Sequence, residues 1–330
     1  MTMNISTRNP SMASRTLRYF GKVVGWRLLF TMTLSVAFGW RSDAHAQNGN
    51  QAAVKTLNLG LVSEINRTAI EEHFRDLVTY VARKLAPGSN LEAKVVVAPT
   101  PFELVKLLEQ KRVDFYMESV YPTYTINYVH DAGKTLLRRW KGGLAEYQSL
   151  IFVRQDSGIR RIDDLRGKPI AFEDPGSTSG YLMAKFFLQR RGLKLAEKKE
   201  FDANASPAQL HYFFAHSQEK LFDAVMTKRA DAGAFSDDDY AHLGAKEKAD
   251  INILGQTEKF PRHLVSVRAD LAIATASRLE TILLGMAEDE EGRRILSKTD
   301  QTTKFDRLPG GDAALRKRLL ESFYSTEINL

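Results

Sequence analysis

The chain has 330 residues, with 47 Lys and Arg against 40 Asp and Glu, and it contains no cysteine. The absence of cysteine excludes disulfides, thiolate metal sites, cysteine nucleophiles and a lipid anchor built on cysteine. Six basic residues and one acidic residue lie in positions 1–46, so the remainder carries 41 and 39, a net charge of +2. The basic balance therefore gives no indication of a nucleic-acid partner.

Residues 1–46 have the pattern of a secretory signal peptide. A basic leader is followed by an apolar run from Leu28 to Trp40, and Ala44-His45-Ala46 fits the small-x-small cleavage pattern. The run of about 13 residues is shorter than the roughly 20 that a membrane-spanning helix needs, which favours cleavage over a retained anchor. We expect a soluble periplasmic protein that begins at Gln47 and has enough residues for two domains.

Apolar patterning and turn residues predict strands that alternate with helices. The expected strands are 55–62, 93–98, 113–117, 147–154, 169–172 and 230–234. The expected helices are 68–85, 102–110, 181–191, 219–228, 277–297 and 312–323, with a helical turn at 163–167. A capping box, Ser277 with Glu280, begins the long helix. Helices between strands indicate βαβ units with a mostly parallel arrangement, and the whole chain is expected to be an α/β fold of mixed sheets flanked by helices.

The alternation begins again near residue 147, which predicts two lobes. Residues 55–153 with 263–330 form the expected first lobe, and residues 154–262 form the second. The chain would cross between them near 150–154 and 262–268. Because ligands of open α/β sheets bind outside the carboxyl ends of the strands, we expect a ligand cleft between the lobes.

The segment Glu173-Asp174-Pro175-Gly176-Ser177-Thr178-Ser179-Gly180-Tyr181 follows a predicted buried strand and begins a helix. Its three consecutive hydroxyl residues, the free backbone N–H groups and the positive end of the helix offer several donors to one anion. The alternative is purely structural, with Ser177 or Thr178 capping the helix. The residues alone leave both interpretations open.

This segment is very similar to the ligand loop of the phosphate-, phosphite- and phosphonate-binding proteins of ABC transporters. The resemblance extends over about residues 56–268 and includes Ala230-Asp231-Ala232-Gly233-Ala234. It implies a two-lobed periplasmic binding protein fold of type II with two crossing strands. It also implies that an oxyanion is bound by Ser177, Thr178 and Ser179, with Gly180 and Tyr181 completing the loop.

The same resemblance implies an acidic residue near Asp238 that would bind the ammonium end of an aminoalkylphosphonate. A second acid of that site is missing, because the chain has Phe260-Pro261-Arg262-His263 where the acid is expected. We therefore expect a ligand without an amine. Arg262 or His263 would supply positive charge to the cleft.

In the first lobe, Glu118, Ser119 and Tyr121 follow a predicted strand and are expected to cover the ligand. Strand alternation places Tyr116 and Glu118 on one face. A carboxylate at that position repels a bare phosphate unless it is protonated, paired with Arg262, or in contact with a cationic group of the ligand. A structural ion pair between Glu118 and an arginine is the alternative interpretation.

These observations favour a periplasmic solute-binding component of an ABC transporter that closes its lobes on an oxyanion and makes no covalent bond. The expected partners are the small ligand and a membrane permease. We expect a monomer with neither cofactor nor metal.

A sensor subunit for a membrane signalling protein would have the same fold. A periplasmic phosphate-ester hydrolase would need a metal cluster or activated nucleophile, and Gly176–Gly180 has threonine rather than serine at its centre, unlike a hydrolase elbow.

Overall fold

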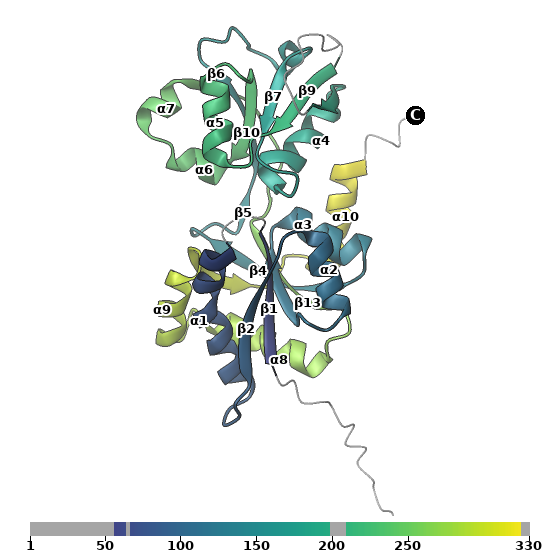
Figure 1. Cartoon of the computed structure of the whole chain (residues 1–330), viewed down its shortest axis with the longest axis vertical. Helices are drawn as coiled ribbons and strands as arrows, with labels where there is room; N and C mark the ends of the chain where they lie inside the picture. The colour runs from purple at the N-terminus through teal and green to yellow at the C-terminus, as the bar shows by residue number, and fades with distance from the viewer. Residues whose placement is uncertain (1–55, 64–66, 199–208, 325–330) are drawn as a thin grey trace, which may run out of the picture. The chain divides into compact units, whose positions relative to one another are not determined.

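The computed structural model describes residues 56–63, 67–198 and 209–324, which form two six-stranded sheets with helices packed on them (Figure 1). The predicted signal peptide lies outside the described residues. No described helix combines the length and the apolar character needed to cross a membrane.

The first sheet has the strand order β14-β4-β13-β3-β1-β2. Its strands are Thr56–Val62 (β1), Glu92–Ala98 (β2), Phe115–Glu118 (β3), Gly133–Lys141 (β4), His263–Arg268 (β13) and Thr302–Asp306 (β14). The helices associated with it are Arg67–Leu85 (α1), Pro101–Glu109 (α2), Val120–Tyr124 (α3) continued by Thr125–Val129 (η1), Ile273–Gly285 (α8) and Glu290–Lys298 (α9).

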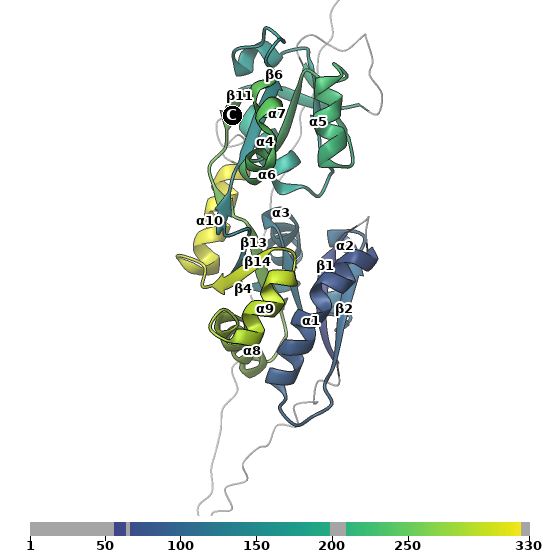
Figure 2. The same cartoon turned by 90° about the vertical axis from the view of Figure 1, so that its left-hand side faces the viewer.

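Helices cover both faces of this sheet. They can do so because apolar residues recur at the strand period in its strands and at the helical period in its helices. In α1, Phe74, Leu77, Val78 and Val81 are buried at helical spacing and pack with Leu59 of β1. They share one core cluster with residues of α8 and α9, which lie beside α1 (Figure 2). A second cluster beneath α2 covers the opposite face. The carboxyl end of β3, with Glu118, is thereby held rigidly at one edge of the sheet.

The second sheet has the order β11-β6-β10-β7-β9-β8. Its strands are Ser149–Arg154 (β6), Pro169–Phe172 (β7), Lys194–Glu197 (β8), Gln209–Phe214 (β9), Ala232–Ser236 (β10) and Ile251–Gln256 (β11). The intervening helices are Ile162–Leu165 (η2), Thr178–Leu182 (η3), Met183–Gln189 (α4), Gln218–Met226 (α5), Asp237–His242 (α6) and Ala245–Ala249 (α7). Residues of α4 and α5 belong to two different core clusters that include alternate residues of β6.

Two short strands connect the sheets. Glu146–Tyr147 (β5) and Phe260–Pro261 (β12) pair antiparallel, with Tyr147 opposite Phe260. β6 pairs with β10 and β11, so it belongs to the second sheet, although the expected lobe boundary placed residues 149–153 in the first lobe. The chain changes sheets just before the predicted crossings.

The first sheet is mixed, as the expected fold class has it, and only the narrower inference of a mostly parallel sheet is wrong here. β1 is parallel to β2 and β3, but β13 is antiparallel to β3 and β4, and β14 is antiparallel to β4. The chain returning from the second sheet enters β13 at the edge where β3 ends, so β13 must run in the opposite direction. Sequence periodicity reports burial within a strand and carries no information on this return path.

The predicted helix 277–297 is also wrong, since α8 begins at Ile273 and ends at Gly285, and α9 begins at Glu290. Asp289 caps α9 by accepting from the Gly292 N–H at 3.2 Å and also accepts from the Tyr80 hydroxyl at 2.7 Å. A Cβ on Gly292 would lie 2.2 Å from the Met286 carbonyl oxygen. The chain can therefore turn sharply here because residue 292 is glycine.

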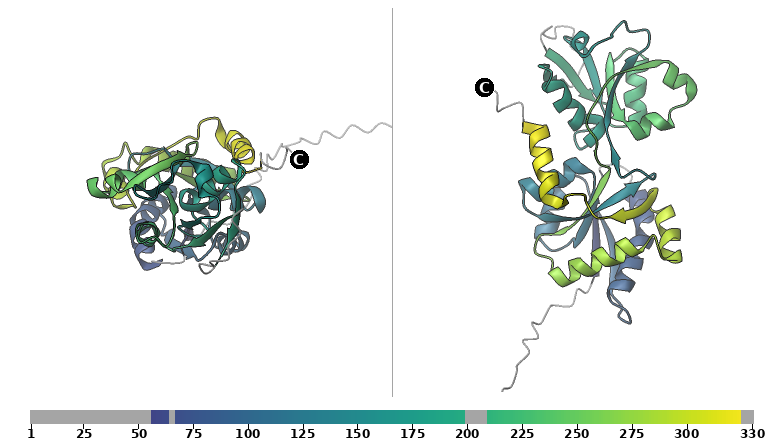
Figure 3. Two further views of the ribbon diagram at one scale, coloured as in Figure 1. Left: turned by 90° about the horizontal axis from the view of Figure 1, so that it is seen from above. Right: turned by 180° about the vertical axis from the view of Figure 1, so that it is seen from behind.

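The last described helix, Gly311–Tyr324 (α10, yellow in Figure 3), follows β14 of the first sheet and packs against elements of both sheets. The Phe323 ring stacks on Phe186 of α4 with centroids 4.8 Å apart. The Phe323 ring also packs edge-to-face with Tyr124 of α3, with the ring centroids 5.2 Å apart. Leu315, Leu319 and Phe323 belong to the largest core cluster of the second sheet, so α10 contributes apolar contacts to elements on either side of the crossing.

We predict that Phe323→Ala lowers the free energy of unfolding by about 3–5 kcal/mol, because the ring is 5% exposed and its removal leaves a cavity. Leu320→Ala is the matched control on the same helix, since Leu320 is 41% exposed and its loss should cost well under about 1 kcal/mol. Denaturant unfolding of both variants measures the difference. Equal stability of the two variants would contradict the packing described for α10.

Candidate functional site

The hydroxyl loop Ser177–Ser179 begins where β7 has ended and η3 starts. Ser177 is the N-cap of η3, and its Oγ accepts from the Gly180 N–H at 3.0 Å and donates to Glu173 Oε2 at 2.8 Å. A Cβ on Gly180 would lie 2.6 Å from the same Glu173 oxygen. Glycine at residue 180 therefore leaves room for the Glu173 side chain to pack against the turn. The Ser177 side chain thus has the capping role that the sequence left open.

Thr178 contacts the beginning of a helix associated with the other sheet. Its Oγ1 donates to Ser119 Oγ at 2.9 Å and accepts from the Tyr121 N–H at 3.0 Å. Ser119 is the N-cap of α3 but makes no side-chain cap bond. The structure therefore brings Ser119 and Tyr121 against Thr178 and places the starts of two helices close together. Hydroxyl and amide donors gathered in this way are suited to an oxyanion.

Tyr147 of β5 is a residue of this site that the sequence analysis missed. Its ring is 1% exposed, and burial raises the pKa of its phenol although hydrogen bonds with the Thr178 and Ser179 side chains oppose the shift. The Ser179 carbonyl oxygen accepts from Ser149 Oγ at 2.6 Å. The only sequence signal for Tyr147 was its position at the start of the predicted strand 147–154, just before a predicted crossing.

Tyr181 lies behind the loop, within an aromatic cluster. Its hydroxyl is 3.2 Å from the Tyr212 hydroxyl and accepts from Lys185 Nζ at 2.9 Å. Its ring packs edge-on against Phe172, with centroids 5.2 Å apart. The side chain therefore anchors the first turn of the helix to the core of the second sheet.

Glu118 ends β3 and is partly buried beside Ser119. Its Oε1 accepts from the Val62 N–H at 2.6 Å. Burial raises the pKa of the carboxyl to about 7, although the backbone N–H groups of Val62 and Ser119 and the charge of Arg139 act in the opposite direction. Proton uptake by this carboxyl near neutral pH thus becomes favourable.

Among the described residues, neither Arg262 nor another arginine forms an ion pair with Glu118. Arg262 Nη2 lies 3.2 Å from Asp238 Oδ2, and the guanidinium lies over the Tyr147 ring at 4.5 Å. Asp238, in the first turn of α6, is 8% exposed. The resemblance implied that Asp238 would bind an ammonium group of the ligand. In the structure, Asp238 pairs with Arg262 instead.

His263 does not supply the positive charge expected of it. Burial lowers the pKa of its imidazole well below the ordinary value, and the cations Arg139, Arg262 and Lys141 lower it further. The ring is therefore neutral at neutral pH. Its Nδ1 is buried without a hydrogen-bond partner among the described residues.

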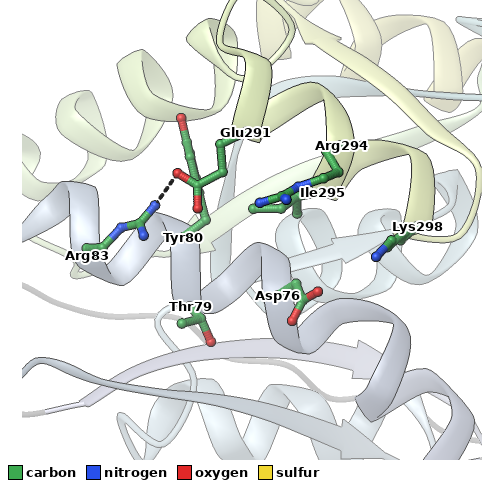
Figure 4. A pocket seen from close by; sticks show the side chains of 8 residues that line it. All are labelled: Asp76, Thr79, Tyr80, Arg83, Glu291, Arg294, Ile295 and Lys298. Carbon is green, nitrogen blue, oxygen red and sulfur yellow. Dashed lines mark hydrogen bonds and ion pairs between the residues drawn. The ribbon is translucent and has the colours of Figure 1, made fainter.

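A surface pocket of about 320 Å³ lies elsewhere, between α1 and α9 (Figure 4). It is lined by Asp76, Thr79, Tyr80, Arg83, Glu291, Arg294, Ile295 and Lys298. Arg83 and Glu291 form an ion pair at 2.5 Å across it. None of the predicted ligand residues lines this pocket. Across the part of the chain that the structure describes, no three His, Asp or Glu residues gather to hold a metal ion.

Comparison with known proteins defines the class. The model of the family described as ABC transporter, phosphonate, periplasmic substrate-binding protein matches residues 59–308. The chain belongs to this family, whose members are substrate-binding proteins of transport systems. The resemblance noted from the hydroxyl loop is thereby confirmed.

Among curated proteins, the phosphate-import protein PhnD of Mycolicibacterium smegmatis is 27% identical over 198 residues, which are 52% of this chain. The match spans only 58% of the length of that relative.

Solved structures show the same fold. XAC2383 from Xanthomonas citri bound to ATP aligns with a TM-score of 0.74 and 27% identity, over 83% of this chain and 98% of that one. PhnD1 from Prochlorococcus marinus in complex with methylphosphonate aligns with a TM-score of 0.61 and 15% identity, over 81% and 97% of the two chains. The type II periplasmic binding protein fold is confirmed.

We predict that Glu118→Gln stabilises the protein at pH 8 by about 2 kcal/mol but has little effect at pH 4. A pKa raised from 4.5 to about 7 means that the ionised carboxylate destabilises the fold. This penalty is absent below the ordinary pKa, grows as the pH rises, and is complete above pH 7. Thermal or denaturant unfolding at the two pH values measures the difference. A stability change that is equal at both pH values would contradict it. The exposed Glu109→Gln on α2 serves as control.

Proposed function

We propose that this protein captures a phosphate-, phosphite- or phosphonate-type oxyanion in the periplasm and delivers it to the permease of an ABC transporter. Membership of the family supports transport of such a solute. The observation that carries the ligand class is the contact of Thr178 with Ser119 and the Tyr121 N–H, because it gathers donors from two helix starts around one point.

The similar proteins are consistent with a tetrahedral group on phosphorus as the common feature of the ligand. One relative at 27% identity is a phosphate-import protein, and a second at 27% identity was solved with ATP. A bound oxyanion would accept hydrogen bonds from the Thr178 and Ser179 hydroxyls and from backbone N–H groups of η3 and α3. Charge-assisted bonds of this kind are stronger than neutral ones.

Capture would proceed by closure of two lobes around the crossing strands β5 and β12. The sequence analysis assigned residues 55–153 and 263–330 to the first lobe and residues 154–262 to the second. Because β6 pairs with strands of the second sheet, we place the first boundary at about residue 148. Hinge closure allows a protein to cover a ligand with few moving residues. The signal peptide would direct export, and its cleavage after Ala46 would leave a soluble protein in the periplasm.

We predict that Thr178→Val weakens binding of methylphosphonate and phosphate by roughly 10- to 100-fold. The substitution keeps the side-chain volume and removes a hydrogen bond to a charged ligand, worth about 1.5–3 kcal/mol. Isothermal titration calorimetry measures the dissociation constants. Thr281→Val is the matched control, because Thr281 Oγ1 donates to the Ser277 carbonyl on exposed α8. Undiminished affinity in the Thr178 variant would contradict the proposed site.

We predict that the wild-type protein prefers methylphosphonate to aminoethylphosphonate, because Arg262 already pairs with Asp238 and would repel an ammonium group. Arg262→Gln should release Asp238 and shift the preference toward the amine by roughly tenfold or more. The exposed Arg278→Gln on α8 is the control. Competition titrations with the two phosphonates measure the ratio. An unchanged ratio in the Arg262 variant would show that Asp238 does not face the ligand.

A further inference from the structure

The two helix starts that meet at Thr178 are also joined further along their helices. Thr178 begins η3, which continues into α4, and Ser119 is the N-cap of α3. Phe323 of α10 lies between these helices, because its ring stacks on Phe186 of α4 at 4.8 Å and packs edge-to-face with Tyr124 of α3 at 5.2 Å between centroids. One residue outside the proposed anion site therefore contacts both helices that carry its donors.

The Phe323 ring is buried in a core that includes residues of both helices. It is 5% exposed and belongs to the same apolar cluster as Val120 of α3, Leu182 of η3 and Phe187 of α4. Protein interiors are packed as densely as organic crystals, so this burial leaves the helices little room to shift. Stacked and edge-to-face aromatic pairs add a preferred geometry to that packing. The ring can therefore fix the separation of the two helices.

Other contacts hold α10 itself in place. The Tyr128 hydroxyl of η1 donates to Asp312 Oδ1 at 2.6 Å, and the Arg316 guanidinium lies 5.5 Å from the centre of the Tyr128 ring. Two turns before the end of the chain that the structure describes, Arg318 Nε lies 3.2 Å from Glu258 Oε2, in the segment that leads into β12. These contacts set the position of the last turn of α10, which carries the ring, before any ligand binds.

We infer that Phe323 is a positioning residue for the oxyanion site: its ring holds α3 and the continuous helix η3–α4 at the separation at which their starts meet. At that separation, the Thr178 hydroxyl contacts Ser119 Oγ and the Tyr121 N–H. The inference rests on the proposed function and adds to it a residue that acts through the helices instead of touching the ligand. The ring lies about one to two turns beyond the donors, so its loss lets both helices shift and separates the donors. Hydrogen bonds weaken steeply when they are lengthened or bent.

Isothermal titration calorimetry with methylphosphonate and phosphate tests the inference, at a temperature at which circular dichroism shows each variant to be folded. We expect Phe323→Ala to bind both ligands roughly 10-fold more weakly than wild type, because the donors are no longer held together before binding. Phe323→Leu restores most of the apolar volume and should recover most of the affinity. Leu283→Ala is the matched control, since it empties a fully buried position in the core of the first sheet and should bind as wild type.

Amide hydrogen exchange at Tyr121, followed by NMR, gives a second readout that needs no ligand. The Tyr121 N–H donates to Thr178 Oγ1 at 3.0 Å, so this bond slows its exchange only while the two helix starts are together. We expect exchange about tenfold faster in Phe323→Ala than in Leu283→Ala, a comparison that removes the effect of lower global stability. Should Phe323→Ala fail to fold, Phe186→Ala removes the other ring of the stacked pair and replaces it in both measurements, with the same expected results.

Two results would overturn the inference and leave the proposed function intact. One is wild-type affinity, or wild-type exchange at Tyr121, in Phe323→Ala. The other is an equal loss of affinity in Phe323→Ala and Leu283→Ala, because a general loss of core packing would then explain the effect. If the wild-type protein binds neither methylphosphonate nor phosphate, the proposed function fails, and the exchange at Tyr121 still decides whether Phe323 positions the two helix starts.

Discussion

The pairing of the two crossing strands is the constraint on which the site depends. Tyr147 lies opposite Phe260, and the Arg262 N–H donates to the Ala145 carbonyl at 2.8 Å. This register places the Arg262 guanidinium over the Tyr147 ring and within reach of Asp238, while the Tyr147 phenol reaches Thr178 and Ser179. A slip of one residue would turn these side chains to the opposite faces and dismantle the site.

Charge compensation distinguishes the structural ion pairs from the groups available to a ligand. Asp238 and Asp300 are each matched by cations at 2.8–3.2 Å, and these buried pairs are costly to break because a lone charge would remain. Glu118 instead relies on backbone N–H groups and a raised pKa. Glu118 therefore differs from these two acids in having no ion-pair partner among the described residues.

The hydroxyl loop could be recognised from sequence because its turn and its hydroxyl groups come from adjacent residues. Ser177, Thr178 and Gly180 act within one turn, so their types and spacing reveal both the cap and the donors. The partners of that loop could not be recognised with the same certainty. Ser119 and Tyr121 were expected to cover the ligand, but the bonds of Thr178 to both join segments that are distant along the chain.

The sequence by itself determined the family, the alternating α/β elements and the hydroxyl loop at the start of a helix, because local periodicity and turn chemistry encode them. Only the tertiary structure decided that β13 runs antiparallel, that α8 and α9 are separate, and that Tyr147 belongs to the site. It also decided that Arg262 pairs with Asp238 and that His263 is neutral. These outcomes depend on burial and on distances between remote segments, which no local pattern specifies.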